Sequence, residues 1–459
     1  MNRHRHIAVI DVGKTNAKLA LVDGTTLQEI AVVTRPNLAL SGPPWPSFDL
    51  EGHWAFFLDH LAVFQAKHGI DAISITTHGA SAVLLDRNGK LAAPMLDYEH
   101  DGPESMAADY DAIRPPFDQT GSPRLPNGLN LGAQLFWQFE TDPVLREKVA
   151  HVLTYPQFWG HRLTGRMATD VTSLGCHTDL WNPRQGTFSA LVDRLDLTQK
   201  MAPPRRADDV LGTISPDIAE RTGLPQHVPV LCGIHDSNAS LYPHVLAHDG
   251  PFSVVSTGTW VIAMAMGNDT PALDPARDTL INVNALGQPV PSARFMGGRE
   301  YEMMRNGSNT VPTDQDRAEV LSGIALLPSV VKDSGPFKDR HHSWTQQPKT
   351  QGARMLALSW YLALVTDTCL SLIGAQGPVI VEGPFTRNPD FTSMLTALRG
   401  DVRIAASATG TSVGASLLAG YDAQLPETTP VTCSNPEPMR AYAAFWGRHL
   451  TGTIPMSAL

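Results

Sequence analysis

The first residues of the chain alternate between apolar runs and short polar turns. Residues 7–12 are mostly apolar, Gly13-Lys14-Thr15-Asn16 follows, and residues 17–22 are mostly apolar again. A short apolar run bounded by glycine and polar residues is typical of a buried strand. The pattern predicts a hairpin over residues 7–22, a turn at Asp23-Gly24 and a third strand over residues 29–34.

Helical spacing begins after residue 50. The apolar positions that recur with this spacing are Trp54, Phe57, Leu58, Leu61 and Phe64. They predict an amphipathic helix over residues 51–67 that ends before Gly69. Residues 72–77 predict a fourth strand, and Asn88-Gly89 predicts a hairpin between residues 83–85 and 90–92.

The rest of the chain is regular mainly in its second half. Residues 102–215 are rich in proline and glycine, and we expect one helix there, over residues 146–163. Strands are expected over residues 228–233 and on both sides of Thr257-Gly258-Thr259, within residues 252–266. The remaining pattern predicts helices over residues 352–373, 389–398 and 412–418, and strands over residues 379–381 and 402–406. Asn388-Pro389 has the residues of a helix start.

Two glycine turns are similar although more than half the chain separates them. Gly13 and Gly258 each lie between two apolar runs and beside small polar residues. The similarity fits an internal repeat of two lobes, and it also fits two unrelated hairpins. Strands followed by helices indicate an α/β protein in either case.

Composition narrows the function classes. The net charge of −10 argues against nucleic acid or an anionic membrane as the main partner. No run approaches the roughly 18 apolar residues of a membrane span, and the apolar run after the basic N-terminus is too short for a signal peptide. Four cysteines without a CxxC pair fit reduced thiols. We therefore expect a cytoplasmic protein.

The first glycine turn resembles a phosphate-binding loop only in part. Gly13-Lys14-Thr15 matches the end of the GxxxxGK[ST] pattern, but Ala8 stands where its first glycine is required. A strand, and not a helix, is also expected after the turn. A hairpin whose turn amides hold phosphate oxygens fits better. Asp11 would then hold hydrated Mg²⁺ against the phosphates.

A further carboxylate follows a predicted strand in the middle of the chain. Asp236 stands in Gly233-Ile234-His235-Asp236-Ser237-Asn238-Ala239, after the strand at residues 228–232. Ligands of α/β proteins bind at the carboxyl ends of strands, where a carboxylate can accept a proton from a hydroxyl that attacks phosphorus. The alternative is an aspartate that caps the next helix.

These segments together resemble the sugar kinases of the FGGY family, within the hexokinase–actin–chaperone superfamily. The matching segments stand in the family order; they are Asp11–Lys18 for the first phosphate motif, Thr76–Gly79 and Tyr98–Asp101 for the sugar site, Gly233–Ala239 for the catalytic motif and Ser256–Trp260 for the second phosphate motif. His235-Asp236 and the Ser-x-Gly-Thr-Trp pattern are most similar to rhamnulokinases and fuculokinases.

The resemblance implies two actin-like, ribonuclease H-like lobes with a cleft between them. Residues 1–246 would form the sugar-binding and catalytic lobe, and residues 247–459 the nucleotide-binding lobe. Asp236 would be the general base and Asp11 the Mg²⁺ ligand. The sugar would contact His78, Gly79, Glu99, His100, Asp101 and His235. ATP would contact Gly13, Lys14, Thr15, Asn16, Thr257, Gly258, Thr259, Gly383 and Asn388.

The sequence departs from the family pattern in two places. Lys14 stands where many members have serine, threonine or alanine. The adenosine motif usually has consecutive glycines, and here it reads Glu382-Gly383-Pro384-Phe385-Thr386-Arg387-Asn388. Phe385 would either pack against adenine or fill the core, and the change leaves the preferred nucleotide open.

The implied activity is ATP-dependent phosphorylation of a ketose at a primary hydroxyl, for a sugar of the rhamnulose, fuculose or xylulose type. A polyol kinase, a catalytically silent sugar- or nucleotide-binding regulator and an actin-like assembly protein are the alternatives. The presence of both Asp11 and Asp236 argues against the regulator, and the sugar segments argue against the assembly protein. The expected partners are sugar, ATP and Mg²⁺, without nucleic acid or membrane, and a homodimer is an open expectation.

Overall fold

The computed structural model describes residues 5–267, 269–405, 410–420 and 427–451. The chain divides into two compact units. Unit 1 comprises Met1–Ala247, Ile281–Pro289 and Thr409–Leu425, and unit 2 comprises His248–Leu280, Val290–Ala408 and Pro426–Leu459. The predicted boundary fell between residues 246 and 247, whereas two short later segments also join unit 1.

A mixed sheet forms the centre of unit 1. Its order is β13-β14-β6-β1-β2-β3, and these strands are β1 (His6–Val12), β2 (Asn16–Asp23), β3 (Gln28–Pro36), β6 (Ala72–Thr77), β13 (Val210–Thr213) and β14 (Pro229–Leu231). The short strand β15 (Ile234–His235) also pairs with β6. β1 runs antiparallel to β2 and parallel to β6. The strands expected at the N-terminus, at residues 72–77 and near residue 230 are thereby confirmed.

Helix α1 (Leu50–His68) packs against this sheet and confirms the helix expected over residues 51–67. The Asp49 side chain accepts a hydrogen bond from the Gly52 amide at the N-terminus of α1. At the C-terminus Gly69 has a φ of 75°, a conformation that favours glycine. The apolar side chains of α1 lie in one core cluster with those of β1 and β2.

The prediction of one helix over residues 146–163 is wrong, because a strand interrupts it. This stretch contains α5 (Pro143–Lys148), β8 (His151–Thr154) and α6 (Tyr155–Thr164). β8 pairs antiparallel with β7 (Ala82–Leu85) along all four of its residues. The prediction from helical periodicity failed here because pairing with a distant strand overrides local propensity.

The hairpin expected at Asn88-Gly89 is confirmed only as a turn. The Asp86 amide donates to the Lys90 carbonyl at 2.8 Å, and Leu85 and Leu91 form a single bridge. The main partner of β7 is β8, so residues 90–92 do not form the second strand.

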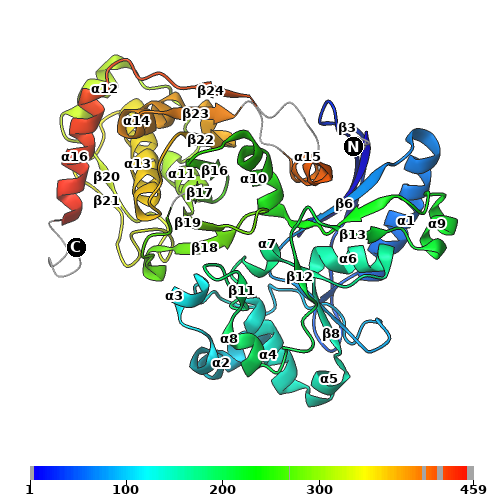
Figure 1. The fold of residues 1–459 in the computed structure, drawn as a ribbon. Helices are drawn as coiled ribbons and strands as arrows, with labels where there is room; N and C mark the ends of the chain where they lie inside the picture. The colour runs from blue at the N-terminus through cyan, green and yellow to red at the C-terminus, as the bar shows by residue number, and fades with distance from the viewer. Residues whose placement is uncertain (1–4, 268, 406–409, 421–426, 452–459) are drawn as a thin grey trace. The chain divides into compact units, whose positions relative to one another are not determined.

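Unit 2 is built around most of a second sheet, whose strand order is β18-β19-β17-β16-β22-β23-β24 (Figure 1). Its strands are β16 (Phe252–Thr257), β17 (Val261–Met266), β18 (Thr279–Val283), β19 (Pro289–Phe295), β22 (Val379–Glu382), β23 (Val402–Ala405) and β24 (Thr428–Pro430). Its main helices are α11 (Gly297–Arg305), α12 (Asp314–Leu321), α13 (Gln351–Leu372), α14 (Pro389–Arg399) and α16 (Glu437–Thr451). These elements confirm the predicted hairpin and the predicted helices and strands after residue 350, apart from residue 406, which lies outside the described residues.

The remaining elements of unit 1 lie mostly in the proline- and glycine-rich middle of the chain. They include η1 (Gly102–Met106), α2 (Ala107–Ile113), α3 (Phe117–Thr120), α4 (Leu131–Thr141), α7 (Val171–Leu174), α8 (Ala190–Arg194), α9 (Pro216–Thr222), α10 (Asp236–Ala247) and α15 (Thr411–Ser416). α15 and η4 (Leu417–Ala419) correspond to the helix expected over residues 412–418.

The two sheets share a topology that favours an internal repeat over two unrelated hairpins. In unit 1 the central order is β3-β2-β1-β6-β14, and in unit 2 it is β19-β17-β16-β22-β23. β1 is antiparallel to β2 and parallel to β6, and in the same way β16 is antiparallel to β17 and parallel to β22. Each glycine turn therefore has the same position in its own sheet.

Helix α13 is the one described helix that is long and apolar enough to cross a membrane. In its most apolar stretch 78% of the residues are buried within the protein. It packs against α11, α12 and α14, and its side chains form much of the core of unit 2. This is the environment of a core helix.

Candidate active site

Asp236 is the first residue of α10 and directly follows β15. Its Oδ1 accepts a hydrogen bond from the Ser237 amide at 2.6 Å and lies 3.1 Å from Nε2 of His235. Its side chain is 28% exposed. The carboxylate is therefore fixed at a helix N-terminus, where negative charge is favoured, and is still open to a ligand.

His78 lies at the end of β6 and is buried among aromatic rings. The rings of Phe48, Tyr98 and Tyr155 lie 5.1–5.3 Å from its own. Its Nδ1 donates to the Gly79 carbonyl at 2.9 Å, and its buried Nε2 finds no hydrogen-bond partner among the described residues. Burial lowers the pKa of His78, which keeps the ring neutral and Nε2 an acceptor. An unpartnered buried acceptor of this kind suits a ligand hydroxyl.

Gly79 allows the end of β6 to pass close to His235. A Cβ atom at this position would lie 2.8 Å from Nε2 of His235, closer than real Cβ atoms approach. Any side chain here would displace the ring that contacts Asp236. Glycine at position 79 is therefore required by the packing of the site itself.

The side chain of Lys14 does not lie where the phosphate-turn prediction placed it. Its ammonium group forms ion pairs with Asp97 and, at 3.2 Å, with Glu99. It also lies over the rings of Phe48 and Tyr98, at 5.0 and 4.5 Å from their centres. The long side chain thus leaves the turn and joins the segment that was assigned to the sugar.

Asp97 lies among the candidate site residues, although the sequence motifs did not indicate it. Its side chain is mostly buried, and Oδ1 accepts from both the Lys14 ammonium group and the Glu99 amide. The only available signal was an acidic residue directly before the Tyr98–Asp101 segment. Burial distinguishes it from the exposed acids that follow it.

His100 and Asp101 lie farther out in the same segment. Nδ1 of His100 is 3.7 Å from Oδ1 of Asp101, and the His100 ring makes an edge contact with Trp137. The Asp101 side chain is almost fully exposed. Neither is as enclosed as His78, so the two form an outer part of the predicted sugar segment.

Asp11 at the end of β1 is held by residues from the far end of the chain. Its Oδ2 accepts hydrogen bonds from the Thr411 and Ser412 hydroxyls of α15 and lies 3.4 Å from Nζ of Lys18. α15 can approach because Gly414 has no side chain; a Cβ there would lie 1.8 Å from the Ala239 carbonyl oxygen. The sequence predicted a helix over residues 412–418, but it did not indicate that this helix contacts Asp11.

The turn after β1 is braced from behind by Asn37. The Asn37 amide groups donate to the carbonyls of Thr15 and Gly13, at 2.9 and 2.8 Å. Nε2 of the buried His53 donates to the Asn37 side chain at 2.8 Å. Thr15 and Asn16 remain exposed at the tip. The turn is thus a supported loop with an open outer surface, as a phosphate-binding turn requires.

The second glycine turn, in unit 2, is tied to the altered adenosine motif. The Thr257 hydroxyl donates to the Glu382 carbonyl at 2.6 Å and accepts from the Phe385 amide at 3.1 Å. Gly383 has a φ of 85°, and a Cβ there would lie 2.0 Å from the Thr257 carbonyl oxygen. The hydroxyl of Thr257 is therefore already used within the unit, whereas Gly258 and the exposed Thr259 lie at the tip of the turn.

Two residues of the adenosine motif have structural contacts. The Phe385 ring is only 6% exposed and packs against Phe391 and Tyr301, which supports the core alternative and not adenine stacking. The Asn388 side chain caps α14 by accepting from the Phe391 amide at 3.0 Å. The predicted helix start is confirmed.

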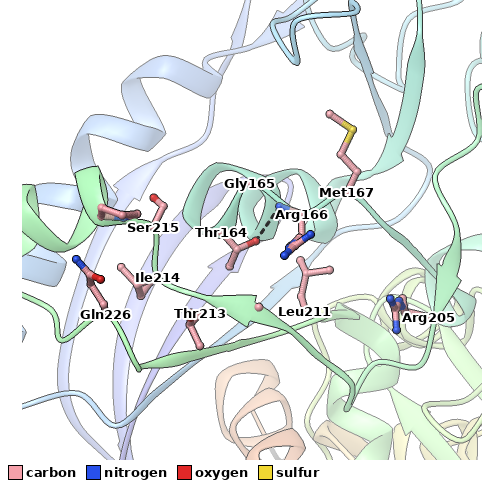
Figure 2. A pocket seen from close by; sticks show the side chains of 12 residues that line it. Thr164, Gly165, Arg166, Met167, Arg205, Leu211, Thr213, Ile214, Ser215 and Gln226 are labelled. Atoms are coloured by element: carbon pink, nitrogen blue, oxygen red, sulfur yellow. Dashed lines mark hydrogen bonds between the residues drawn. The ribbon is translucent and has the colours of Figure 1, made fainter.

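A pocket of about 910 Å³ lies elsewhere in unit 1, between the end of α6 and β13 (Figure 2). Arg166, Arg205 and Gln226 contribute polar groups to its lining. None of the candidate site residues is among the described residues that line it. The pocket is therefore separate from the residues considered for catalysis.

Two family models together match nearly the whole chain. The one described as "FGGY family of carbohydrate kinases, N-terminal domain" matches residues 6–242, slightly more than half of the chain. The one described as "Carbohydrate kinase FGGY, C-terminal domain" matches residues 249–428. The chain therefore belongs to the FGGY family of carbohydrate kinases, and its two units have the actin-like fold of that family.

Individual relatives agree with this assignment. The crystal structure of a carbohydrate kinase from Novosphingobium aromaticivorans is 37% identical, with a TM-score of 0.89, and the match covers 98% of this chain and 99% of that one. An L-fuculokinase from Salmonella typhi is 28% identical over 266 residues, which is 56% of each chain. A rhamnulokinase from Enterobacter sp. (strain 638) is 28% identical over 275 residues, 58% of this chain and 48% of that protein. The chain thus spans about half the length of the curated relatives it matches.

Proposed function

We propose that this protein is an ATP-dependent sugar kinase that transfers the γ-phosphoryl group to a primary hydroxyl of a ketose, with Asp236 as the general base. The observation that carries the proposal is the pairing, in one unit, of a partly exposed carboxylate at Asp236 with an unpartnered buried acceptor at His78. Matches to an L-fuculokinase and a rhamnulokinase support a deoxyketose or related ketose as the substrate class.

In this proposal the sugar contacts His78, Gly79, Glu99, His100, Asp101 and His235, and Asp97 is added to them. Nε2 of His78 would accept a hydrogen bond from one sugar hydroxyl, since the ring is neutral and this nitrogen has no partner among the described residues. The acidic segment would accept hydrogen bonds from other hydroxyls. Lys14 is reassigned from ATP to this group, because its ammonium group is already held by Asp97 and Glu99.

The proton of the reacting hydroxyl would pass to Asp236 as the oxygen attacks phosphorus. A carboxylate oxygen within reach of the hydroxyl can accept this proton. Asp236 also has a fixed orientation, because both Ser237 and His235 contact its Oδ1. Orientation of the nucleophile is a large part of catalysis in phosphoryl transfer.

The residues around Asp11 fit a hydrated Mg²⁺. All three described contacts of this carboxylate are made to Oδ2, so Oδ1 can accept from metal-bound water. Mg²⁺ in phosphoryl-transfer sites is held by one or two carboxylates, waters and substrate phosphates, and no larger protein cage is needed. When bound, the ion would offset negative charge on the phosphates.

We assign ATP contacts to the turns at Gly13, Thr15 and Asn16 and at Gly258 and Thr259, with Thr257, Gly383 and Asn388 as residues that shape the second site. The hydrogen bonds of Thr257 and the cap at Asn388 support a shaping role for these two side chains. Pro384 contributes no amide donor to the motif, so the preferred nucleotide is part of the test below.

A catalytically silent sugar-binding regulator on the same fold is the second candidate. It would use the same His78 acceptor without turnover. Asp236 argues for the kinase, since a regulator has no need of a partly exposed carboxylate fixed beside the sugar residues. We retain the expectations of a cytoplasmic location and of a homodimer as predictions.

The deciding experiment is a turnover assay with ATP and GTP across a panel of ketoses and polyols. The proposal expects ADP release that depends on one or a few ketoses, and a phosphorylated sugar as product. Sugar binding without turnover by any member of the panel would favour the regulator. Turnover with polyols alone would keep the kinase and reject the ketose.

A further inference from the structure

Cys176 lies beside the candidate catalytic residues although no role has been assigned to it. It follows α7, its side chain is 5% exposed, and its Sγ lies 3.9 Å from Nε2 of His235. The same nitrogen is 3.1 Å from Oδ1 of Asp236. One imidazole nitrogen thus faces a sulfur on one side and the proposed general base on the other.

The surrounding backbone holds these groups together. The His235 amide donates to the Thr172 hydroxyl at 3.0 Å, and Asp170 caps α7 by accepting from the Thr172 and Ser173 amides. Gly79, at the end of β6, packs against the cluster as well: a Cβ at this position would lie 3.6 Å from Sγ of Cys176. The cluster is therefore built from α7, the end of β6 and β15, and it is not an incidental approach of two side chains.

The charges in the cluster favour a thiolate next to a protonated ring. Burial would raise the pKa of the Cys176 thiol, but the neighbouring His177 and His235 outweigh it and lower that pKa to about 5. Burial would likewise lower the pKa of His235, but Cys176 and Asp236 raise it to about 10. At neutral pH the two groups carry opposite charges and stabilise each other.

The other two buried cysteines behave as ordinary core residues. Burial raises the pKa of Cys232 and of Cys369, so both remain thiols at neutral pH. Neither has a histidine among the groups that shift it. Cys176 differs because of its neighbours, and Cys369, in α13 of unit 2, is a matched control.

We propose that Cys176 is a positioning residue for phosphoryl transfer. Its Sγ contacts the His235 ring, and this contact keeps the ring where it holds the Asp236 carboxylate in place. This role rests on the proposed kinase function. Cys176 forms no bond to substrate, and no electron passes through it; the only proton that moves goes from the sugar hydroxyl to Asp236. Loss of the thiolate would free the ring to lose its proton and would release Asp236.

Other ionisable groups also face this cluster and enter its pH dependence. Asp170 faces His235 from the start of α7, and its negative charge also favours the protonated ring. His78 faces His235 and Asp236 from the end of β6, and Lys14 acts on His78. His177 follows Cys176 directly and donates through Nδ1 to the Leu129 carbonyl. The serine variant leaves all of these groups in place.

The kinetic test compares the full-length chain with Cys176→Ser and Cys369→Ala over a range of pH. In Cys176→Ser the His235 ring loses its anionic partner, so the pH above which kcat falls should move down by at least about one unit. At neutral pH we expect kcat to fall about tenfold or more, with the sugar KM within about twofold. Cys369→Ala should keep the wild-type profile. An unchanged profile in Cys176→Ser would overturn the proposal.

A second measurement follows the ionisation of the thiols directly in the wild-type chain, by carbon NMR of cysteine labelled at Cβ. The proposal expects one cysteine that is ionised at pH 7 and titrates near pH 5, with its signal absent in Cys176→Ser. Four protonated thiols at pH 7 would overturn the charge pair. The thiolate signal without turnover of any sugar would instead reject the kinase function, and the positioning role with it.

Discussion

Nζ of Lys14 lies 3.2 Å from Oε2 of Glu99, although one residue belongs to the turn after β1 and the other to the predicted sugar segment. The same ammonium group pairs with the more deeply buried Asp97. The turn assigned to phosphate and the segment assigned to sugar are therefore joined by one side chain. A ligand that binds at one of these segments should therefore change the affinity of the other segment for its own ligand through Lys14.

Replacement of Lys14 tests this link. Lys14→Ala should raise the sugar KM about tenfold, since a charge-assisted contact to a mostly buried carboxylate is worth roughly 1.5–3 kcal/mol. The ATP KM should change less if the side chain acts on the sugar side. Steady-state kinetics with each substrate varied in turn would measure both. Lys67→Ala, at an exposed position of α1, is the control, and a larger effect on ATP than on sugar would return Lys14 to the phosphate turn.

Asp236→Asn should abolish most turnover while sugar still binds. The amide keeps the size of the carboxylate but cannot accept the hydroxyl proton, and general bases typically contribute about 10²–10⁴-fold. Sugar affinity, measured by calorimetry, should stay within about tenfold. The matched control is Asp59→Asn, an exposed change on α1. Turnover within a few-fold of the wild type would remove Asp236 from the mechanism.

Asp11→Asn should shift the dependence of turnover on Mg²⁺ to higher concentrations. The neutral amide attracts a hydrated cation less than the carboxylate does, whereas the sugar KM should stay nearly the same. A Mg²⁺ titration of the rate measures the effect. Ser412→Ala removes one hydrogen bond to Asp11 but leaves its charge, so its titration should remain close to that of the wild type. If both variants behave alike, Asp11 serves to anchor α15 and not to bind the ion.

Phe385→Ala should unfold more easily and change ATP kinetics little. The ring is buried against Phe391 and Tyr301 in the core of unit 2, and removal of a buried phenyl ring typically costs about 3–5 kcal/mol. Chemical denaturation would measure the loss, and Phe385→Leu should recover much of it. A folded Phe385→Ala variant whose ATP KM rises tenfold would instead support contact with adenine.

Stability should fall as the pH is lowered through the ordinary range of histidine. Burial and the nearby Arg35 lower the pKa of His53 to about 4, so the unfolded chain binds a proton below about pH 6.5 that the folded chain does not. Each such histidine reduces the free energy of unfolding by about 1.4 kcal/mol per pH unit between these two values. His53→Gln should therefore show a shallower decline between pH 6 and 4.5 in chemical denaturation. Parallel declines in the two chains would show that His53 takes up a proton in the folded state.

Local pattern was enough to predict most of the elements that carry the site. The hairpins at residues 7–22 and 252–266, α1 and the C-terminal α/β stretch all follow from apolar spacing and from end signals such as Gly69 and Asn388. These features depend on neighbours within a few residues, so the sequence contains them directly. The residue types of the motifs likewise indicated the family, because Asp11, His235 and Asp236 stand in its order.

Only the tertiary structure decided which distant residues come into contact. β8 replaced the middle of an expected helix because it pairs with β7, about 70 residues earlier in the chain. Asp11 is held by Thr411 and Ser412, about 400 residues away. Lys14 turns toward Asp97, Phe385 turns into the core, and Cys176 meets His235. In each case the outcome depends on which distant atoms surround a side chain, because burial and nearby charge set its orientation and its ionisation, and local spacing carries no information about either.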